Sequence, residues 1–279
     1  MLVPVFTPDA DHITQEETRR AFQAMVTCPY GAIRLRKPDP LVKAVVEEDF
    51  PIPVDPELLP GVYHLGYHHK GSMGATPYLI VRPGGKGNVM VDAPRFNGRL
   101  ARQIEALGGV AYHVITHEGA APDHDYWHAY FPDSERVLHR MDVTRAMRDE
   151  VEAVLNGKGP WAMDDDVKLV ALPGYTLGSV GLIYRPEGGA TGAVLFSGRT
   201  VGWSPRLNQL DGFAQFSRGN LVKQAESIRA LAEEEWAFEW ILPAEGTRYR
   251  FPSPQARASL LQEAADRFLE RGRVGGLSM

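Results

Sequence analysis

The residues best suited to chemistry lie in one short stretch, where His117 is followed by Asp123 and His124. The apolar run 111–116 predicts a buried strand that ends just before His117, and residues 122–131 predict a helix. Side chains at strand ends and helix starts point into the cleft above a sheet, where ligands collect. Histidine and aspartate bind zinc, iron and manganese. The stretch therefore indicates either a metal site or a hydrogen-bonded histidine followed by an ordinary helix cap.

Other polar clusters are weaker candidates. His68 and His69 follow the strand expected over residues 62–65, in a loop that can form the rim of the same cleft and contact a ligand. His128 lies one helical turn after His124, but no third ligand accompanies these two histidines. The acidic run 164–166 is typical of a solvated turn rather than of a cation site.

The composition narrows the possible classes of function. The 279 residues are 44% hydrophobic and 23% charged, as in a globular protein, with a net charge of −5 and no basic cluster suited to nucleic acid. The one cysteine, Cys28, excludes an internal disulfide and any site that needs several thiolates. No apolar stretch approaches the ~20 residues of a membrane span, and the N-terminus lacks the basic region of a signal peptide. We therefore expect a cytoplasmic protein that binds neither nucleic acid nor a membrane.

The sequence divides into three parts. Residues 1–36 contain a helix whose start is marked by the capping-box pair Thr14 and Glu17. Residues 37–60 are rich in proline, which favours extended backbone, so we expect a linker there. Residues 61–279 carry the main domain.

Within the main domain, β-prone runs come first and then alternate with helical patterns. We expect strands over residues 62–65, 78–82, 89–92, 111–116, 137–138, 168–172, 180–185, 193–197 and 240–242. We expect helices over residues 97–107, 122–131, 143–155 and 221–236, and a last helix from Pro254 to Gly272. This order predicts sheets that are covered by helices on their outer faces.

The order of short motifs in the main domain resembles that of the metallo-β-lactamase superfamily. The matching pieces are Tyr63–Gly66, the strand that ends at Asp92, Thr116-His117 with Asp123-His124, Pro173–Ser179, Phe196–Thr200 and Leu242–Gly246. The resemblance covers about residues 60 to 250. It implies an α/β fold, the αββα four-layer sandwich, with its site at one edge where the loops of the two sheets meet.

The N-terminal part is similar to the end of a bacterial-type ferredoxin, because a helix is followed by Cys28-Pro29. One branch of the superfamily carries such a module ahead of its hydrolase domain. The region that would hold the other cluster cysteines is missing, and a cluster needs about four thiolates. We therefore expect a truncated ferredoxin-like remnant without an iron–sulfur cluster, in which Cys28 is packed. An upstream start outside this chain is the competing explanation.

The resemblance also shows where the metal-ligand pattern has changed. The family's motif is H-x-H-x-D-H. His117 matches its first histidine and Asp123-His124 match its final Asp-His, but Gly119 stands where its second histidine is expected. All nine histidines lie at or before His139, so no later segment supplies one. The former metal-site positions are therefore His117, Asp123, His124, Tyr175, Arg199 and Glu245, of which the last three replace a histidine, an aspartate and a histidine.

Arg199 argues most strongly against a metal centre. A permanently charged guanidinium, in place of an aspartate that bridges two cations, repels a bound divalent metal. A guanidinium can instead bind a carboxylate with two parallel hydrogen bonds. We expect Arg199 to pair with Asp123 or Glu245 and to fill the old site, with the Tyr175 hydroxyl bonded to His117 or to a neighbour.

Three functions follow from these residues. The first is a protein with a degenerate metal centre and no cofactor, which is non-hydrolytic, binds a small molecule or a protein partner and can form a homo-oligomer. The second is a hydrolase of an ester, thioester or lactam-like bond, with one zinc, iron or manganese ion held by His117, Asp123 and His124. The third is metal-free acid–base catalysis by Tyr175, Glu245 or a histidine. We expect the first.

Overall fold

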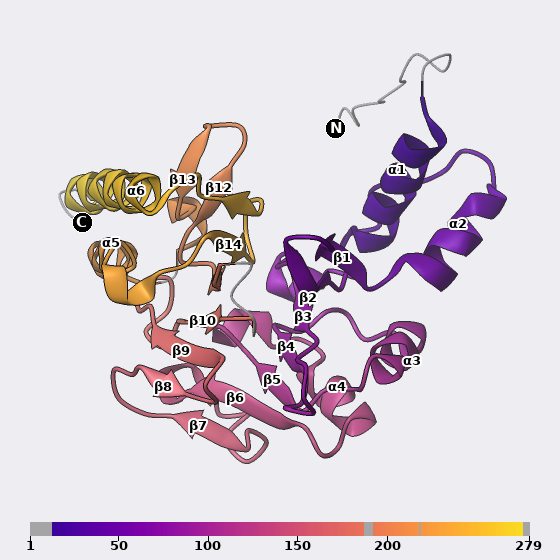
Figure 1. Cartoon of the computed structure of the whole chain (residues 1–279), viewed down its shortest axis with the longest axis horizontal. Coiled ribbons are helices and arrows are strands. Elements are labelled where there is room, and N and C mark those ends of the chain that lie inside the picture. The colour runs from indigo at the N-terminus through magenta and orange to yellow at the C-terminus, as the bar shows by residue number, and fades with distance from the viewer. Residues whose placement is uncertain (1–12, 187–191, 218, 276–279) are drawn as a thin grey trace.

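The computed structural model describes residues 13–186, 192–217 and 219–275, which form two sheets packed face to face with helices on both outer sides (Figure 1). The alternation of side chains along strand β10 (Val180–Tyr184) explains this packing. Leu182 and Tyr184 belong to the apolar cluster between the sheets, whereas Ile183 belongs to the cluster under the C-terminal helices. A strand that is apolar on both faces must be covered on both faces, which gives the four layers.

The first sheet has seven strands in chain order. They are β1 (Ile52–Asp55), β2 (Leu59–His64), β3 (Tyr78–Ile80), β4 (Val89–Val91), β5 (Tyr112–Val114), β6 (Glu135–His139) and β7 (Ala153–Leu155). Strands β1 to β4 pair antiparallel, and β4 to β7 pair parallel. The parallel half matters for the site, because its strands all end at the same edge of the sheet.

The second sheet has six strands, in the order β15-β14-β11-β10-β9-β8. Their bounds are β8 (Trp161–Ala162), β9 (Val167–Ala171), β10, β11 (Val194–Gly198), β14 (Trp240–Pro243) and β15 (Tyr249–Arg250). Strands β11 and β14 are parallel and end together. A separate hairpin, β12 (Gly202–Ser204) and β13 (Gln209–Asp211), follows β11.

The helices cover the two outer faces. Helices α3 (Gly98–Ala106) and α4 (His124–Tyr130) pack on the first sheet, and α5 (Leu221–Ala230) and α6 (Pro254–Gly275) lie side by side on the second (Figure 1). The N-terminal helices are α1 (Gln15–Thr27) and α2 (Pro40–Ala44), and short helical turns are η1 (Val45–Asp49), η2 (Lys70–Ser72), η3 (Glu118–Ala120), η4 (Arg140–Asp142), η5 (Ala214–Phe216) and η6 (Glu234–Trp236). Among the helices in the described ranges, none combines the length and the apolar character that a membrane crossing needs.

Most of the expected elements are present, and the αββα sandwich is confirmed. Helix α1 has the expected capping box, in which the Thr14 hydroxyl accepts from the Glu17 N–H and the Glu17 carboxylate accepts from the Thr14 N–H. The expected start of α6 is also found, but the helix continues past Gly272 to Gly275. The helix expected over residues 143–155 is wrong. Turns replace its first part and β7 replaces its end, because pairing with β6 outweighs the local pattern.

The proline-rich segment 37–60 is not the extended linker that we expected. Asp39 caps α2, and Pro40 occupies its first position, where a missing N–H costs nothing. Strand β1 pairs with β2, so the first sheet begins inside this segment. Val45 and Phe50 are buried in the same cluster as Phe22 of α1. The N-terminal part therefore packs on the first sheet, and its ferredoxin-like origin stays a prediction.

Candidate functional site

The ends of parallel strands bring the site residues to one edge of the sandwich. Asp92 and His117 follow β4 and β5, whose carboxyl ends lie side by side in the first sheet. Arg199 and Glu245 follow β11 and β14, which end together in the second sheet. A backbone hydrogen bond from Val180 N–H to the Thr116 carbonyl, 2.9 Å long, joins the two sheets at this edge.

Arg199 is the centre of a buried polar network. Its Nη1 donates to the Tyr175 hydroxyl at 3.1 Å, and its Nη2 donates to the Ser72 carbonyl at 2.5 Å. The same Nη2 lies 3.4 Å from Glu245 Oε2. Arg199 and Tyr175 are only 4% and 2% exposed. The pair of Arg199 with Glu245, one of the two that the sequence suggested, is therefore present, and the Tyr175 hydroxyl is bonded to Arg199 rather than to His117.

Glu245 is the most accessible member of this network, with 28% of its side chain exposed. Burial raises the pKa of its carboxyl group, although the charge of Arg199 acts in the opposite direction. The carboxylate is thus partly desolvated, and Arg199 is the charge that compensates it.

His117 is held between Thr116 and Tyr175. Its Nδ1 lies 3.0 Å from the Thr116 hydroxyl, and its ring packs edge-on against Tyr175 with centroids 4.9 Å apart. Thr116 is in turn bonded to Asp92, through its N–H at 2.8 Å and its hydroxyl at 3.0 Å. Burial raises the pKa of Asp92 to about 7, against the opposing effects of Thr116 and Arg199. The polar chain Asp92–Thr116–His117 fixes the orientation of the imidazole.

Asp123 and His124 do not join His117 in a metal site. Asp123 Oδ2 accepts from the Phe96 N–H at 2.8 Å, and its Oδ1 lies 3.5 Å from His69. His124 is engaged by Arg136, whose Nη1 is 3.2 Å from His124 Nδ1. A catalytic zinc needs about three converging protein ligands. Within the described residues, the one group of three or more histidine, cysteine or carboxylate side chains with ligand atoms within 4.8 Å of one another is Asp164–Asp166. His117, Asp123 and His124 therefore do not form such a group in the part of the chain that the structure describes.

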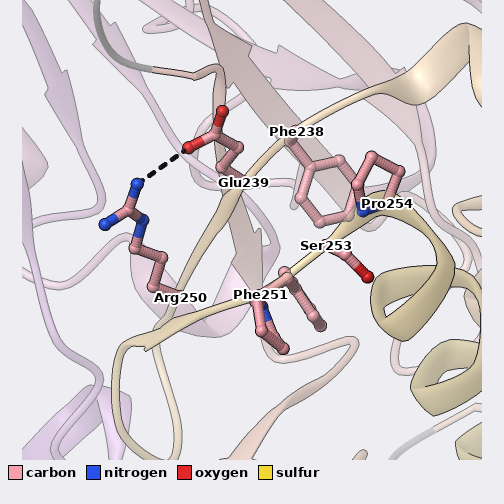
Figure 2. Close-up of a pocket in the computed structure, with 7 residues that line it drawn as sticks. Phe238, Glu239, Arg250, Phe251, Ser253 and Pro254 are labelled. Atoms are coloured by element: carbon pink, nitrogen blue, oxygen red, sulfur yellow. Dashed lines mark hydrogen bonds and ion pairs between the residues drawn. The ribbon is translucent and has the colours of Figure 1, made fainter.

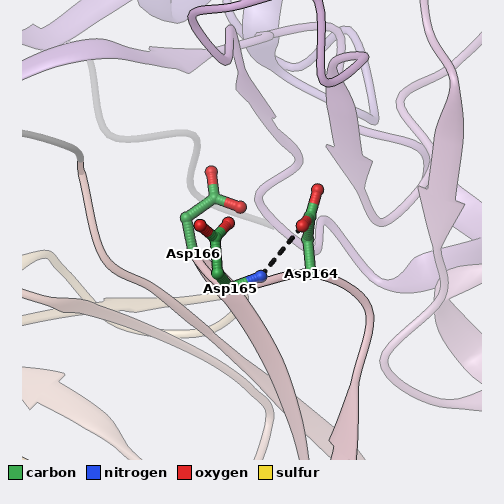
Figure 3. Close-up of side chains that lie close together, drawn as sticks. All are labelled: Asp164, Asp165 and Asp166. Carbon is green, nitrogen blue, oxygen red and sulfur yellow. Dashed lines mark hydrogen bonds between the residues drawn. The ribbon is translucent and has the colours of Figure 1, made fainter.

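Each carboxylate of the acidic run 164–166 has an ion-pair partner. Figure 3 shows its three carboxylates close together. Arg82 Nη2 lies 2.6 Å from both Asp164 Oδ2 and Asp166 Oδ1, and Lys86 Nζ lies 2.7 Å from Asp165 Oδ1. Asp164 and Asp165 are exposed, as expected of a solvated turn, whereas Asp166 is only 4% exposed. The two cations from the β3–β4 turn offset two of the three negative charges and link the two sheets.

The loop after β2 contacts Asp123 and Arg199. His69 Nδ1 accepts a hydrogen bond from the Gly71 N–H at 2.8 Å, and His69 Nε2 lies 3.5 Å from Asp123 Oδ1. The Ser72 carbonyl accepts the hydrogen bond from Arg199. His68 turns inward, with its Nε2 3.0 Å from Nε2 of His64. Five cavities of the structure, the two largest of about 420 and 480 Å³, are lined by none of the six former metal-site residues.

Asp142 is a site residue that the sequence did not reveal. Its buried carboxylate accepts from the Glu118 N–H at 3.0 Å, from the Thr176 hydroxyl at 2.5 Å and from the Gly178 N–H at 2.8 Å. One side chain thus fixes both the turn after His117 and the turn that carries Tyr175. The aspartate lies in a segment where we expected only a turn before a helix, so no local pattern marked it.

The comparisons with known proteins agree with this architecture. No protein-family model matches the sequence, and no curated protein matches it. A metallo-β-lactamase from Cronobacter sakazakii, solved as a HARLDQ motif mutant, aligns with a TM-score of 0.52 at 13% identity over 80% of this chain and 98% of its own. VMB-1 aligns with a TM-score of 0.53 at 14% identity over 71% and 85%. The DIM-1 metallo-β-lactamase aligns with a TM-score of 0.53 at 13% identity over 73% and 94%. The chain therefore has the metallo-β-lactamase fold.

Proposed function

We propose that this chain is a metallo-β-lactamase-fold protein in which a polar network centred on Arg199 replaces the metal centre, and which binds a small molecule or a protein partner without hydrolysing it. The observation that carries the proposal is the position of Arg199. Its guanidinium is bonded at once to Tyr175, Glu245 and the Ser72 carbonyl.

Electrostatics explains why this network and a metal exclude each other. Two unit charges about 4 Å apart interact by about 4 kcal/mol at an effective dielectric constant of about 20, and a divalent cation doubles that energy. The guanidinium stays protonated, so it cannot relieve the repulsion by losing a proton. A metal held by His117 would therefore have to displace Arg199 and break its three contacts.

The one-metal hydrolase is less well supported. It requires Asp123 and His124 to turn toward His117, but Asp123 is bonded to Phe96 and His124 to Arg136. These bonds hold the two side chains in their present orientations, and the positive charge of Arg136 beside His124 disfavours a cation there.

Elemental analysis tests the proposal. The protein is produced without a histidine tag in medium supplied with zinc, iron and manganese. We expect less than about a tenth of a metal ion per chain and no hydrolysis of a chromogenic lactam, an aryl ester or a thioester above the buffer rate. One metal or more per chain, or hydrolysis that a chelator abolishes, contradicts the proposal.

A further inference from the structure

We propose that the cavity between α5 and the Pro173–Ser179 turn binds an amphipathic monocarboxylate, which is an apolar chain that carries one carboxylate. The inference rests on the proposed function, because it names the ligand site of a protein whose former metal centre is closed. The cavity has a volume of about 480 Å³, within the range of small-molecule sites.

The cavity lies on the other side of the turn that closes the old site. The Tyr175 side chain points from this turn toward Arg199, whereas Pro173, Leu177 and Ser179 of the same turn line the cavity. The end of β9 and the outer side of α5 complete the wall. A ligand bound here would therefore contact the turn that carries Tyr175 without reaching Arg199.

The lining contains apolar surface that is exposed to water when no ligand is bound. Met141 and Leu177 are 59% and 56% exposed, and both line the cavity beside Ala171, Pro173 and Ala230. Burying apolar area contributes about 25 cal/mol per Å². Two large exposed apolar side chains at one cavity favour a ligand with an apolar portion.

The charges at the cavity favour a single negative group. Lys158 and Lys223 line it from two separate segments, and neither has an ion pair with another residue in the described part of the chain. Glu226 is the acidic residue of the lining. Two cations and one anion leave one positive charge, which matches one carboxylate rather than a dianion.

The walls are fixed before any ligand binds. His139 Nε2 lies 3.0 Å from the Gly157 carbonyl, and the Ser227 hydroxyl donates to the Pro173 carbonyl at 2.7 Å. Asp142 holds the Gly178 N–H at 2.8 Å. A site whose backbone segments are already held in place loses less entropy on binding.

A second cavity shows how the charges of the lining distinguish the two cavities. It has a volume of about 380 Å³ and lies at the start of α6, where Figure 2 shows Glu239 and Arg250 pointing toward each other. Their atoms Oε2 and Nη2 are 3.5 Å apart, so the two charges of that lining neutralise each other. The cavity beside α5 differs because its two lysines are not matched by two carboxylates.

Isothermal titration calorimetry with decanoate tests the site in the full chain. We expect saturable binding of one decanoate per chain, with decanol and butyrate each binding at least about tenfold more weakly, since each lacks one of the two features. The double variant Lys158→Met/Lys223→Met removes both charges and shortens each side chain by only one heavy atom. It should weaken decanoate about tenfold while leaving decanol unchanged. The matched control Lys43→Met, on α2, should bind as the unaltered protein does.

Three results would overturn the inference: no saturable binding up to about 1 mM decanoate, equal affinity for decanol, or no effect of the double variant. These outcomes are separate from failure of the proposed function. A chain with bound metal that still binds decanoate at this cavity contradicts the proposed function alone. A metal-free chain that ignores decanoate contradicts the site alone.

Discussion

Arg199 Nη1 donates to the Tyr175 hydroxyl at 3.1 Å, and both side chains stand at positions where the resemblance implies metal ligands. The carbon Cζ of the guanidinium also lies 5.7 Å from the centre of the Tyr175 ring. The two replacements therefore act as a unit, because each provides the partner that the other needs in a buried position. Under the proposed function, these two residues and Glu245 place a guanidinium where the resemblance implies a metal ion.

Removing the guanidinium should destabilise the fold. Arg199→Ala leaves the Tyr175 hydroxyl, the Ser72 carbonyl and the half-buried Glu245 carboxylate without this donor, so we expect a loss of about 3 kcal/mol in the free energy of unfolding. Urea denaturation followed by circular dichroism measures it. The control Arg206→Ala, at an exposed arginine, should cost less than about 0.5 kcal/mol. Equal losses in the two variants would show that the network contributes nothing to stability.

Restoring the family's residue types should restore metal affinity. The triple variant Tyr175→His/Arg199→Asp/Glu245→His removes the fixed positive charge and adds three potential ligands near His117. We expect its zinc content after dialysis to exceed that of the unaltered protein at least about fivefold, measured by elemental analysis. Circular dichroism checks that the variant is folded. A folded triple variant with no more zinc than the unaltered protein would mean that Arg199 is not what excludes the metal.

The sequence predicted the elements that depend on local patterns. The capping box at Thr14, the cap at Asn97 and the apolar run that forms β10 are short-range features, and the structure has them. The Arg199–Glu245 pair was also among the expectations, because two opposite charges replaced two ligands of one site.

What the sequence could not predict depends on contacts between distant segments. Strand β7 exists because β6 offers it a parallel edge, and its own residues favour that state no more than a helix. Asp142 matters because it meets Glu118 and Thr176 across the site. Ser72 and Arg199 are 127 positions apart in the sequence, and no periodic pattern marks a contact between them.

Asp142 should be as important to stability as Arg199. Asp142→Ala leaves the N–H groups of Glu118 and Gly178 without this acceptor and leaves the Thr176 hydroxyl with only Ser179. We therefore expect a loss of about 3 kcal/mol. The control Asp133→Ala, at an exposed aspartate, should change the free energy of unfolding by less than about 0.5 kcal/mol. Denaturant midpoints of the two variants give the comparison. A loss below about 1 kcal/mol for Asp142→Ala would contradict its bridging role.

The two histidines His64 and His68 should make stability depend on pH. Burial lowers the pKa of His64 to about 3, aided by His68 and Arg248, and burial lowers the pKa of His68 to about 4. Both values lie below the ordinary 6.5, so the unfolded chain binds these protons first. Their stabilising contribution is complete above pH 6.5 and is lost as the pH falls toward about 4 and then about 3.

Asp92 has the opposite effect on stability, because its pKa is raised to about 7 and the folded chain binds this proton before the unfolded chain does. The double variant His64→Gln/His68→Gln keeps Asp92 and removes only the contribution of the two histidines. Between pH 6 and 4.5 the double variant should lose stability less steeply than the unaltered protein, by at most about 1.4 kcal/mol per pH unit for each histidine. Urea denaturation at several pH values gives both slopes. Identical slopes would contradict the assignment.

Cys28 should react as an activated thiol although it has no cationic partner among the contacts described. Burial acts to raise the pKa of its thiol, but hydrogen bonds from the backbone N–H groups of residues 30–33 outweigh burial and lower it. The Ala32 N–H lies 3.4 Å from Sγ. Because the thiolate is the nucleophile, iodoacetamide should alkylate Cys28 faster at pH 7 in the folded protein than in urea, where the backbone donors are lost. Mass spectrometry of timed samples measures both rates. The difference between the two rates should shrink as the pH rises above 9, because the thiol of the unfolded chain also ionises there. If the folded protein reacts more slowly than the unfolded one at pH 7, burial outweighs the backbone donors.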